Sequence, residues 1–139
     1  MLGQNLTGTL LCQAGSYRIA FPAQDVAVID VPTLHAGRWR SARQAFGEPP
    51  AAFRVLLAPS GETVGVDSLE IDSEEHRVMP PPLVLAKWAG GSLMGFIFTR
   101  GALWPLVRLV EFEHFLAGTS REAACAPTQP TRSRGCRRG

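Results

Sequence analysis

The chain has 139 residues, of which 45% are hydrophobic, and a formal net charge of +2 at pH 7. This length allows one domain, or two very small barrels that share a core, and the apolar fraction excludes a wholly disordered protein. Residues 117–139 hold five arginines and one glutamate, 5 − 1 = +4, so the rest of the chain carries 9 − 11 = −2 and only the tail is basic.

The first third of the chain predicts short strands. Residues 7–15 (TGTLLCQAG) and 17–23 (YRIAFPA) are apolar runs joined at a glycine turn, and residues 25–32 (DVAVIDVP) form a third run. The valines of the third run favour a strand, and its final proline ends it. Ser41 is then predicted to cap a single helical turn that runs to Phe46, because a glycine and two prolines follow.

The rest of the chain predicts two hairpins and a closing helix. Residues 52–71 have the pattern of a β-hairpin with its turn at Pro59-Ser60-Gly61. Residues 80–110 repeat the scheme with glycine-containing turns, and residues 110–118 (VEFEHFLAG) suit a short helix. Strands at this spacing predict an all-β barrel or sandwich. From Thr119 onward no periodicity continues, so a disordered tail is expected.

An acidic run lies near the middle of the chain. Its first carboxylates alternate with apolar residues, so we expect Asp67 and Glu70 to face water while Leu69 and Ile71 face the core. The next segment, residues 72–75 (DSEE), lacks the central glycine of an ion-binding loop. We therefore expect a solvated strand face followed by a connection between strands, and no metal site.

Patterns typical of enzymes are missing from the sequence. It contains no nucleophile elbow, phosphate-binding loop or dinucleotide fingerprint, and its three histidines are far apart. The three cysteines show no metal-ligand spacing and are expected to be reduced thiols. The sequence therefore predicts a protein that is not an enzyme and that uses no cofactor.

The same sequence predicts a cytoplasmic protein. No apolar run approaches the roughly 20 residues of a membrane-spanning helix. The N-terminal residues also lack the charged and apolar regions of a secretory signal.

Two basic segments are candidate binding surfaces. Trp39, flanked by Arg38 and Arg40 in a predicted loop, combines residue types favoured at protein interfaces, with packing as the alternative. The arginines of the tail suit nonspecific contact with the phosphates of a nucleic acid, but no aromatic residue is interleaved for stacking. A role as a nucleic-acid accessory protein therefore stays open beside a merely solubilising tail.

Three segments together carry a resemblance. Residues 17–31 (YRIAFPAQDVAVIDV) match a strand–turn–strand pattern, residues 60–82 a glycine-bearing strand with an acidic connection, and residues 90–116 a closing hairpin and helix. In this order they resemble the CheW-like family of chemotaxis coupling proteins over about residues 9–116. The matching positions of the first two segments are Ala20, Phe21, Pro22, Val26, Ile29, Gly61, Val64, Gly65, Val66, Leu69 and Ile71.

The resemblance implies a fold and a function. The fold would be all-β, with two small SH3-like β-barrels in residues 9–116, the first one reduced, a short C-terminal helix, and a disordered Arg-rich tail in residues 117–139. The function would be that of a non-enzymatic adaptor that binds the cytoplasmic tip of a methyl-accepting chemoreceptor, with other CheW-like proteins as further partners. The receptor would lie in an apolar groove between the barrels, lined by Val26, Ile29, Val64, Val66 and Leu69. Core packing is the alternative for each of these five residues.

Two departures from the family pattern bear on partners. Val28 stands where the family has a glutamate, and a block that the family writes as N-hydrophobic-R-G with its flanking strands is missing after residue 37. A standard interface needs roughly 800 Å² from each partner, so this loss predicts weak or absent binding to the CheA-like histidine kinase. Arg38, Trp39 and Arg40, at the junction, are candidates for a replacement contact.

Overall fold

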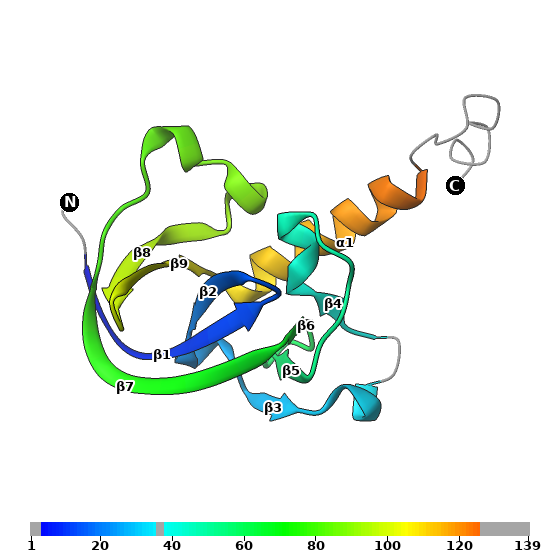
Figure 1. Ribbon diagram of the computed structural model, residues 1–139, viewed down its shortest axis with the longest axis horizontal. Coiled ribbons are helices and arrows are strands. Elements are labelled where there is room, and N and C mark those ends of the chain that lie inside the picture. Colours follow the sequence, from blue (N-terminus) through cyan, green and yellow to red (C-terminus); the bar gives the residue numbers. More distant parts are fainter. Residues whose placement is uncertain (1–3, 36–37, 126–139) are drawn as a thin grey trace.

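Within residues 4–35 and 38–125, which the computed structural model describes, the chain forms nine strands and one C-terminal α-helix (Figure 1). The strands are β1 (Gln4–Ala14), β2 (Tyr17–Pro22), β3 (Val28–Asp30), β4 (Arg40–Ser41), β5 (Arg54–Leu57), β6 (Thr63–Val66), β7 (Ser68–Val78), β8 (Leu93–Thr99) and β9 (Ala102–Val107), and the helix is α1 (Leu109–Cys125). Short 3-10 helices lie between them: η1 (Ala23–Asp25), η2 (Pro32–His35), η3 (Ala42–Phe46), η4 (Leu83–Leu85) and η5 (Trp88–Gly91). The prediction of a mostly β protein with a closing helix is confirmed.

The larger sheet has five strands in the order β7-β1-β2-β9-β8 and curls into a half-barrel (Figure 1). Its pairs are antiparallel except for β2 and β9, which run parallel. The register of β1 against β7 shifts at Gly8, whose φ is 91°, and such a bulge bends a strand. Just beyond β7, Met79 pairs with Phe96 of β8 through two backbone hydrogen bonds of 2.8 Å, which bring the two outer strands of the half-barrel together.

The smaller sheet has four strands in the order β3-β5-β6-β4. The predicted hairpin of residues 52–71 is confirmed as the antiparallel pair of β5 and β6, whereas β4 pairs parallel to β6. The predicted helical turn is also confirmed: the Ser41 hydroxyl accepts a hydrogen bond from the backbone N–H of Arg43, and Gly47 ends η3 in the left-handed conformation.

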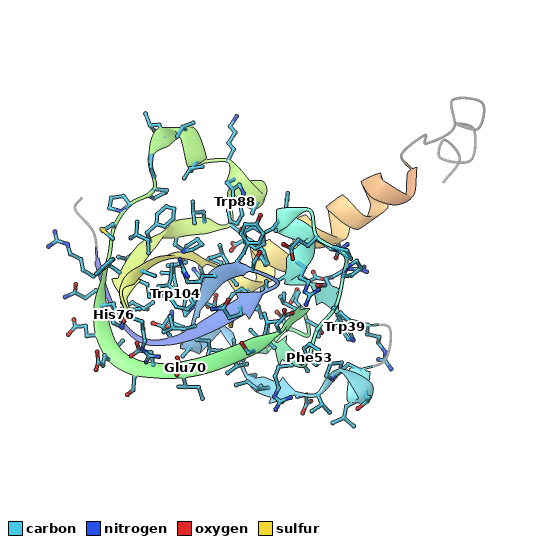
Figure 2. All side chains as sticks on the ribbon, viewed as in Figure 1. Trp39, Phe53, Glu70, His76, Trp88 and Trp104 are labelled. Atoms are coloured by element: carbon cyan, nitrogen blue, oxygen red, sulfur yellow. The ribbon has the colours of Figure 1, made fainter. Side chains whose placement is uncertain are left out.

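One apolar core joins both sheets to the helix. It contains side chains from every one of these three parts, among them Leu10, Ile19, Phe21, Leu56, Val64, Val66, Val107, Leu109, Phe112 and Leu116. A second cluster contains Leu11, Ala20, Val78, Ile97, Trp104 and Leu106, and Figure 2 shows Trp104 inside the half-barrel. All four residues of β6 are buried, so their side chains belong to the core and are not available to a binding surface.

The acidic run differs from its prediction. Residues 68–78 form one eleven-residue strand, β7, which pairs with β1, so the run is not a connection between strands. The faces are also opposite to the expectation at two positions: Ile71 is 66% exposed, whereas Asp72 is only 3% exposed. Inside a strand, a change of one residue in the assumed alternation moves each side chain to the other face.

Helix α1 is longer than the short helix that the sequence predicts. Helix α1 continues to Cys125, beyond residue 116 at which the expected domain ends, and its C-terminal half extends away from the strands (Figure 1). The rest of the predicted tail, residues 126–139, lies outside the described residues. In the part of the chain that is described, no helix is both long enough and apolar enough to cross a membrane.

Candidate functional site

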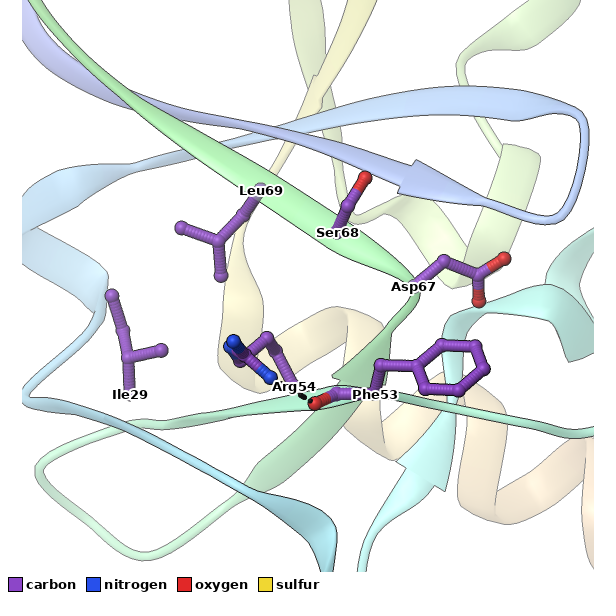
Figure 3. Close-up of a pocket in the computed structure, with 6 residues that line it drawn as sticks. All are labelled: Ile29, Phe53, Arg54, Asp67, Ser68 and Leu69. Carbon is purple, nitrogen blue, oxygen red and sulfur yellow. Dashed lines mark hydrogen bonds between the residues drawn. The ribbon is translucent and has the colours of Figure 1, made fainter.

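A cleft of about 360 Å³ lies between the two sheets (Figure 3). The smaller sheet contributes Ile29 from β3 and Arg54 from β5, with Phe53 directly before β5. The larger sheet contributes Leu69 from β7, next to Ser68 and Asp67. Figure 3 shows the side chains of Ile29 and Leu69 pointing into the same space from opposite sides. The cleft therefore combines two aliphatic walls with one arginine.

The chain passes from one sheet to the other at Asp67, the single residue between β6 and β7. Its carboxylate accepts hydrogen bonds from Arg43 Nε at 3.1 Å and Arg43 Nη2 at 2.8 Å, and from the backbone N–H of Gly15 at 2.9 Å. The hydrogen bonds from Arg43 are the main reason why the pKa of Asp67 lies below its usual value, although partial burial opposes the shift. These contacts tie the crossing point to the β1–β2 turn and to η3, so this end of the cleft is held in place.

The structure brings together only two of the five predicted groove residues. Ile29 is 37% exposed, Leu69 is half-buried and also packs against the shared core, and both line the cleft. Val26 is half-buried against the shared core and does not line the cleft. Val64 and Val66 are completely buried in that core, so the alternative of core packing holds for these two. The physical reason is that β6 lies inside its sheet, between β5 and β4, and buries both of its faces.

The predicted contact Arg38-Trp39-Arg40 is split between packing and surface. Trp39 is half-buried and covers Gly65 of β6, where an added Cβ atom would lie 2.9 Å from Trp39 Cε3. Arg40 belongs to β4, and its Nε lies 3.7 Å from a carboxylate oxygen of Glu113 on α1. Arg38 is exposed. Of the three, Arg38 is the residue most accessible to a partner.

Neither a protein-family model nor a curated protein matches the chain. A functional proposal therefore has to rest on the sequence patterns and on the geometry of the cleft.

Four of the six residues that line the cleft were not among the predicted groove residues: Phe53, Arg54, Asp67 and Ser68. Phe53 is 63% exposed at the rim and Arg54 projects into the cleft (Figures 2 and 3). In the sequence, Phe53 lies in the apolar run that opens a hairpin pattern and would be assigned to the core. The structure shows why Phe53 is not a core residue: it lies just before β5, which begins at Arg54, so the alternation of the strand does not place it.

A second apolar surface lies beside the bridge between Met79 and Phe96. A shallow pocket of about 310 Å³ is lined there by Met79, Pro80, Pro82, Leu85, Phe96 and Leu103. Leu83 and Val84 of η4, next to it, are almost fully exposed. The three prolines hold the chain in an extended course before η4, because each ring fixes φ.

Proposed function

We propose that this protein is a non-enzymatic chemosensory coupling protein with a CheW-like fold, which binds the cytoplasmic tip of a methyl-accepting chemoreceptor. The resemblance of three segments to that family supports the proposal, and those segments occupy β2 to β3, β6 to β7, and β8 to α1. In this proposal the curled five-stranded sheet and the smaller sheet correspond to the two SH3-like barrels of the family fold, the first one reduced.

The observation that carries the proposal is the cleft. Ile29 and Leu69 are far apart in the sequence and come from different sheets, yet they face one space. A helical partner with an apolar stripe fits such a site, since helix-in-groove recognition buries apolar side chains at successive turns. Phe53 at the rim is of a residue type enriched at protein interfaces, and Arg54 inside the cleft is of a type that often dominates binding energy there. The proposed contact set is therefore Ile29, Phe53, Arg54 and Leu69, with Val64 and Val66 supporting it from the core.

The second half of the proposal concerns the histidine kinase, and it follows from the family segment that is missing after residue 37. The chain has only the two-residue strand β4 and η3 between residues 38 and 46, where the family pattern has further strands. With that area lost, the protein binds the histidine kinase weakly or not at all, and modulates array assembly or receptor choice. Arg38, exposed beside Trp39, is the candidate for any replacement contact.

The test of receptor binding uses matched charge substitutions. Ile29→Asp and Leu69→Asp should each weaken binding of a soluble receptor-tip fragment at least about tenfold, because truncation of a central interface residue costs more than about 1 kcal/mol. Phe98→Asp is the control, since Phe98 of β8 is 61% exposed and does not line the cleft. Binding and melting temperature are measured for all three variants.

The outcomes separate contact from folding. The proposal requires Ile29→Asp to lose binding at a nearly unchanged melting temperature, and Leu69→Asp to lose binding while still folded at the assay temperature, whereas Phe98→Asp keeps binding. Loss of binding in all three variants, or in none, contradicts the assignment of the cleft. The kinase regulatory domain is tested separately with the unmodified protein, and an affinity equal to that of a full-length coupling protein would refute the second half of the proposal.

A further inference from the structure

Three side chains that can ligate a metal lie close together on β7. They are Asp72, Glu74 and His76, in the stretch of β7 where its register against β1 shifts. One potential ligand atom from each lies within 4.8 Å of the others. Among the described residues, no other set of three or more His, Cys, Asp or Glu side chains lies close enough together to hold one ion. Figure 2 shows His76 on the curved part of β7, toward the N-terminal end of the chain.

The cluster has a buried side and an open side. Asp72 is almost completely buried, and its Oδ2 lies 3.0 Å from His76 Nε2. Its Oδ1 accepts a hydrogen bond of 2.8 Å from the backbone N–H of Glu74. The Glu74 side chain is exposed, and His76 is only slightly exposed. An ion could therefore enter from the solvent past Glu74 and reach Asp72 and His76.

Thr9 adds an independent observation. It lies directly opposite Asp72 in the antiparallel register of β1 and β7, so its side chain projects beside Asp72 on the same face, with Cβ atoms about 5 Å apart. Thr9 is completely buried, and its Oγ1 has no hydrogen-bond partner among the described residues. A buried hydroxyl beside a buried carboxylate is ordinarily hydrogen-bonded. The arrangement leaves this hydroxyl free to bond a group held between the two strands.

We propose that Asp72, Glu74 and His76 bind a divalent transition metal of the zinc class, with the Thr9 hydroxyl hydrogen-bonded to a metal-bound water. Zinc accepts imidazole nitrogen and carboxylate oxygen together, and three protein ligands with one water complete its tetrahedron. Calcium instead takes six to eight oxygens, and magnesium six, so the imidazole and the small number of carboxylates disfavour both. The two carboxylates also balance the charge of the ion.

Arg100 is the group that opposes this site. Its Nη2 lies 3.6 Å from Asp72 Oδ2, and the same guanidinium pairs with Glu70. Its positive charge repels an incoming cation. Because Arg100 is in the hairpin turn at φ 55°, asparagine can replace it there before Gly101 without loss of the turn. Arg100→Asn should therefore bind the metal more tightly than the unmodified chain does.

The test is a calorimetric titration of the full chain with Zn²⁺. Cys125 and Cys136 are replaced by serine in every sample, so that thiolates outside the site cannot hold the ion. One Zn²⁺ per chain is expected, and both Glu74→Gln and His76→Ala should weaken binding at least about tenfold. His35→Ala is the matched control, because His35 also pairs with a carboxylate, Asp30, at 2.7 Å but belongs to no group of three.

The results decide the proposal in either direction. Saturable binding at one equivalent that falls in both site variants, is unchanged in His35→Ala and rises in Arg100→Asn supports it. No saturable binding, equal binding in Glu74→Gln, or displacement of Zn²⁺ by equimolar Mg²⁺ or Ca²⁺ overturns it. If His76→Ala does not fold, Glu74→Gln still decides, since that side chain is exposed.

Discussion

Gly65 is the residue at which β6, Trp39 and the segment before β5 come closest. A Cβ atom added there would lie 2.6 Å from the Cβ of Ala52 and 2.9 Å from Trp39 Cε3. Gly65→Ala should therefore destabilise the protein by about 1–3 kcal/mol through overpacking. Urea unfolding followed by tryptophan fluorescence measures this loss.

The matched substitution is Gly118→Ala in α1. No atom lies within 4 Å of the added Cβ, and alanine favours a helix over glycine by roughly 0.5–1 kcal/mol. The same chemical change is thus expected to stabilise the protein at Gly118 and destabilise it at Gly65. Equal effects at both glycines would contradict the close packing of Trp39 on β6.

The ionisation of Asp67, where the chain crosses between the sheets, should make the stability of the fold depend on pH. The hydrogen bonds from Arg43, partly opposed by burial and assisted by the N–H of Gly15, hold the pKa of Asp67 below its usual value. A carboxyl whose pKa is lower in the folded state stabilises the fold above its unfolded pKa of about 3.9, and this contribution is lost as pH falls through the folded pKa. Asp67→Asn should therefore melt below the unmodified protein at pH 7, and the gap should narrow below about pH 4. A gap that is constant with pH would exclude an ionic contribution from this residue.

At the scale of elements, helix α1 depends on a cap from outside the helix. The carboxylate of Asp25 in η1 accepts a 3.0 Å hydrogen bond from the backbone N–H of Leu109 and two more from Arg108. Helix N-termini leave backbone N–H groups without intrahelical partners, and Asp25 satisfies one of them across the fold. Asp25→Ala should cost about 0.5–2 kcal/mol, the usual loss for a helix cap.

Asp25→Asn separates the cap from the ion pair. The amide oxygen of asparagine still accepts the hydrogen bond from Leu109, so this variant should lose less stability than Asp25→Ala. Both are measured by urea unfolding followed at the helical circular dichroism signal. If the two variants were equally destabilised, the charge of Asp25 and not the cap would hold α1 on the sheets.

At the scale of the whole molecule, the shared core predicts that the described parts unfold together. Phe112 of α1 is completely buried, packs edge-on against Phe21 of β2 with ring centroids 5.9 Å apart, and contacts Trp88 at 6.4 Å. The same core contains Leu56 and Val66 of the smaller sheet. If α1 left the sheets, apolar side chains of both sheets would be exposed to water. One cooperative unfolding transition is therefore expected.

Phe112→Ala tests that coupling. Removal of a buried phenylalanine side chain costs about 3–5 kcal/mol, and here the loss should lower the stability of both sheets equally. Leu103→Ala is the control, because this residue is half exposed and its loss should change stability by less than about 0.5 kcal/mol. Tryptophan fluorescence and far-ultraviolet circular dichroism should give coincident transitions for the unmodified protein. Two separate transitions would mean that the sheets are independent units.

The sequence by itself determined the local elements of this protein. The turn at Gly15, the helical turn from Ser41 to Gly47 and the hairpin at residues 52–71 form where they were predicted. Residues 80–110, predicted to repeat the scheme, contain the hairpin of β8 and β9, with η4 and η5 before it. Each depends mainly on nearby residues: a glycine that accepts positive φ, a hydroxyl that caps the N–H two residues later, or apolar runs joined by a tight turn.

Only the tertiary structure decided which strands meet and which face of each lies inward. The parallel pairs β2–β9 and β4–β6 join segments far apart in the chain, and no local pattern specifies them. The pairing of β7 with β1 places Asp72 inside and Ile71 outside, which is opposite to the alternation predicted from the sequence. The same pairings bury Val64 and Val66 while leaving Ile29 and Leu69 in one cleft. The physical reason is that side chains alternate with a period of two along a strand, so the register chosen by distant partners assigns every residue to core or surface.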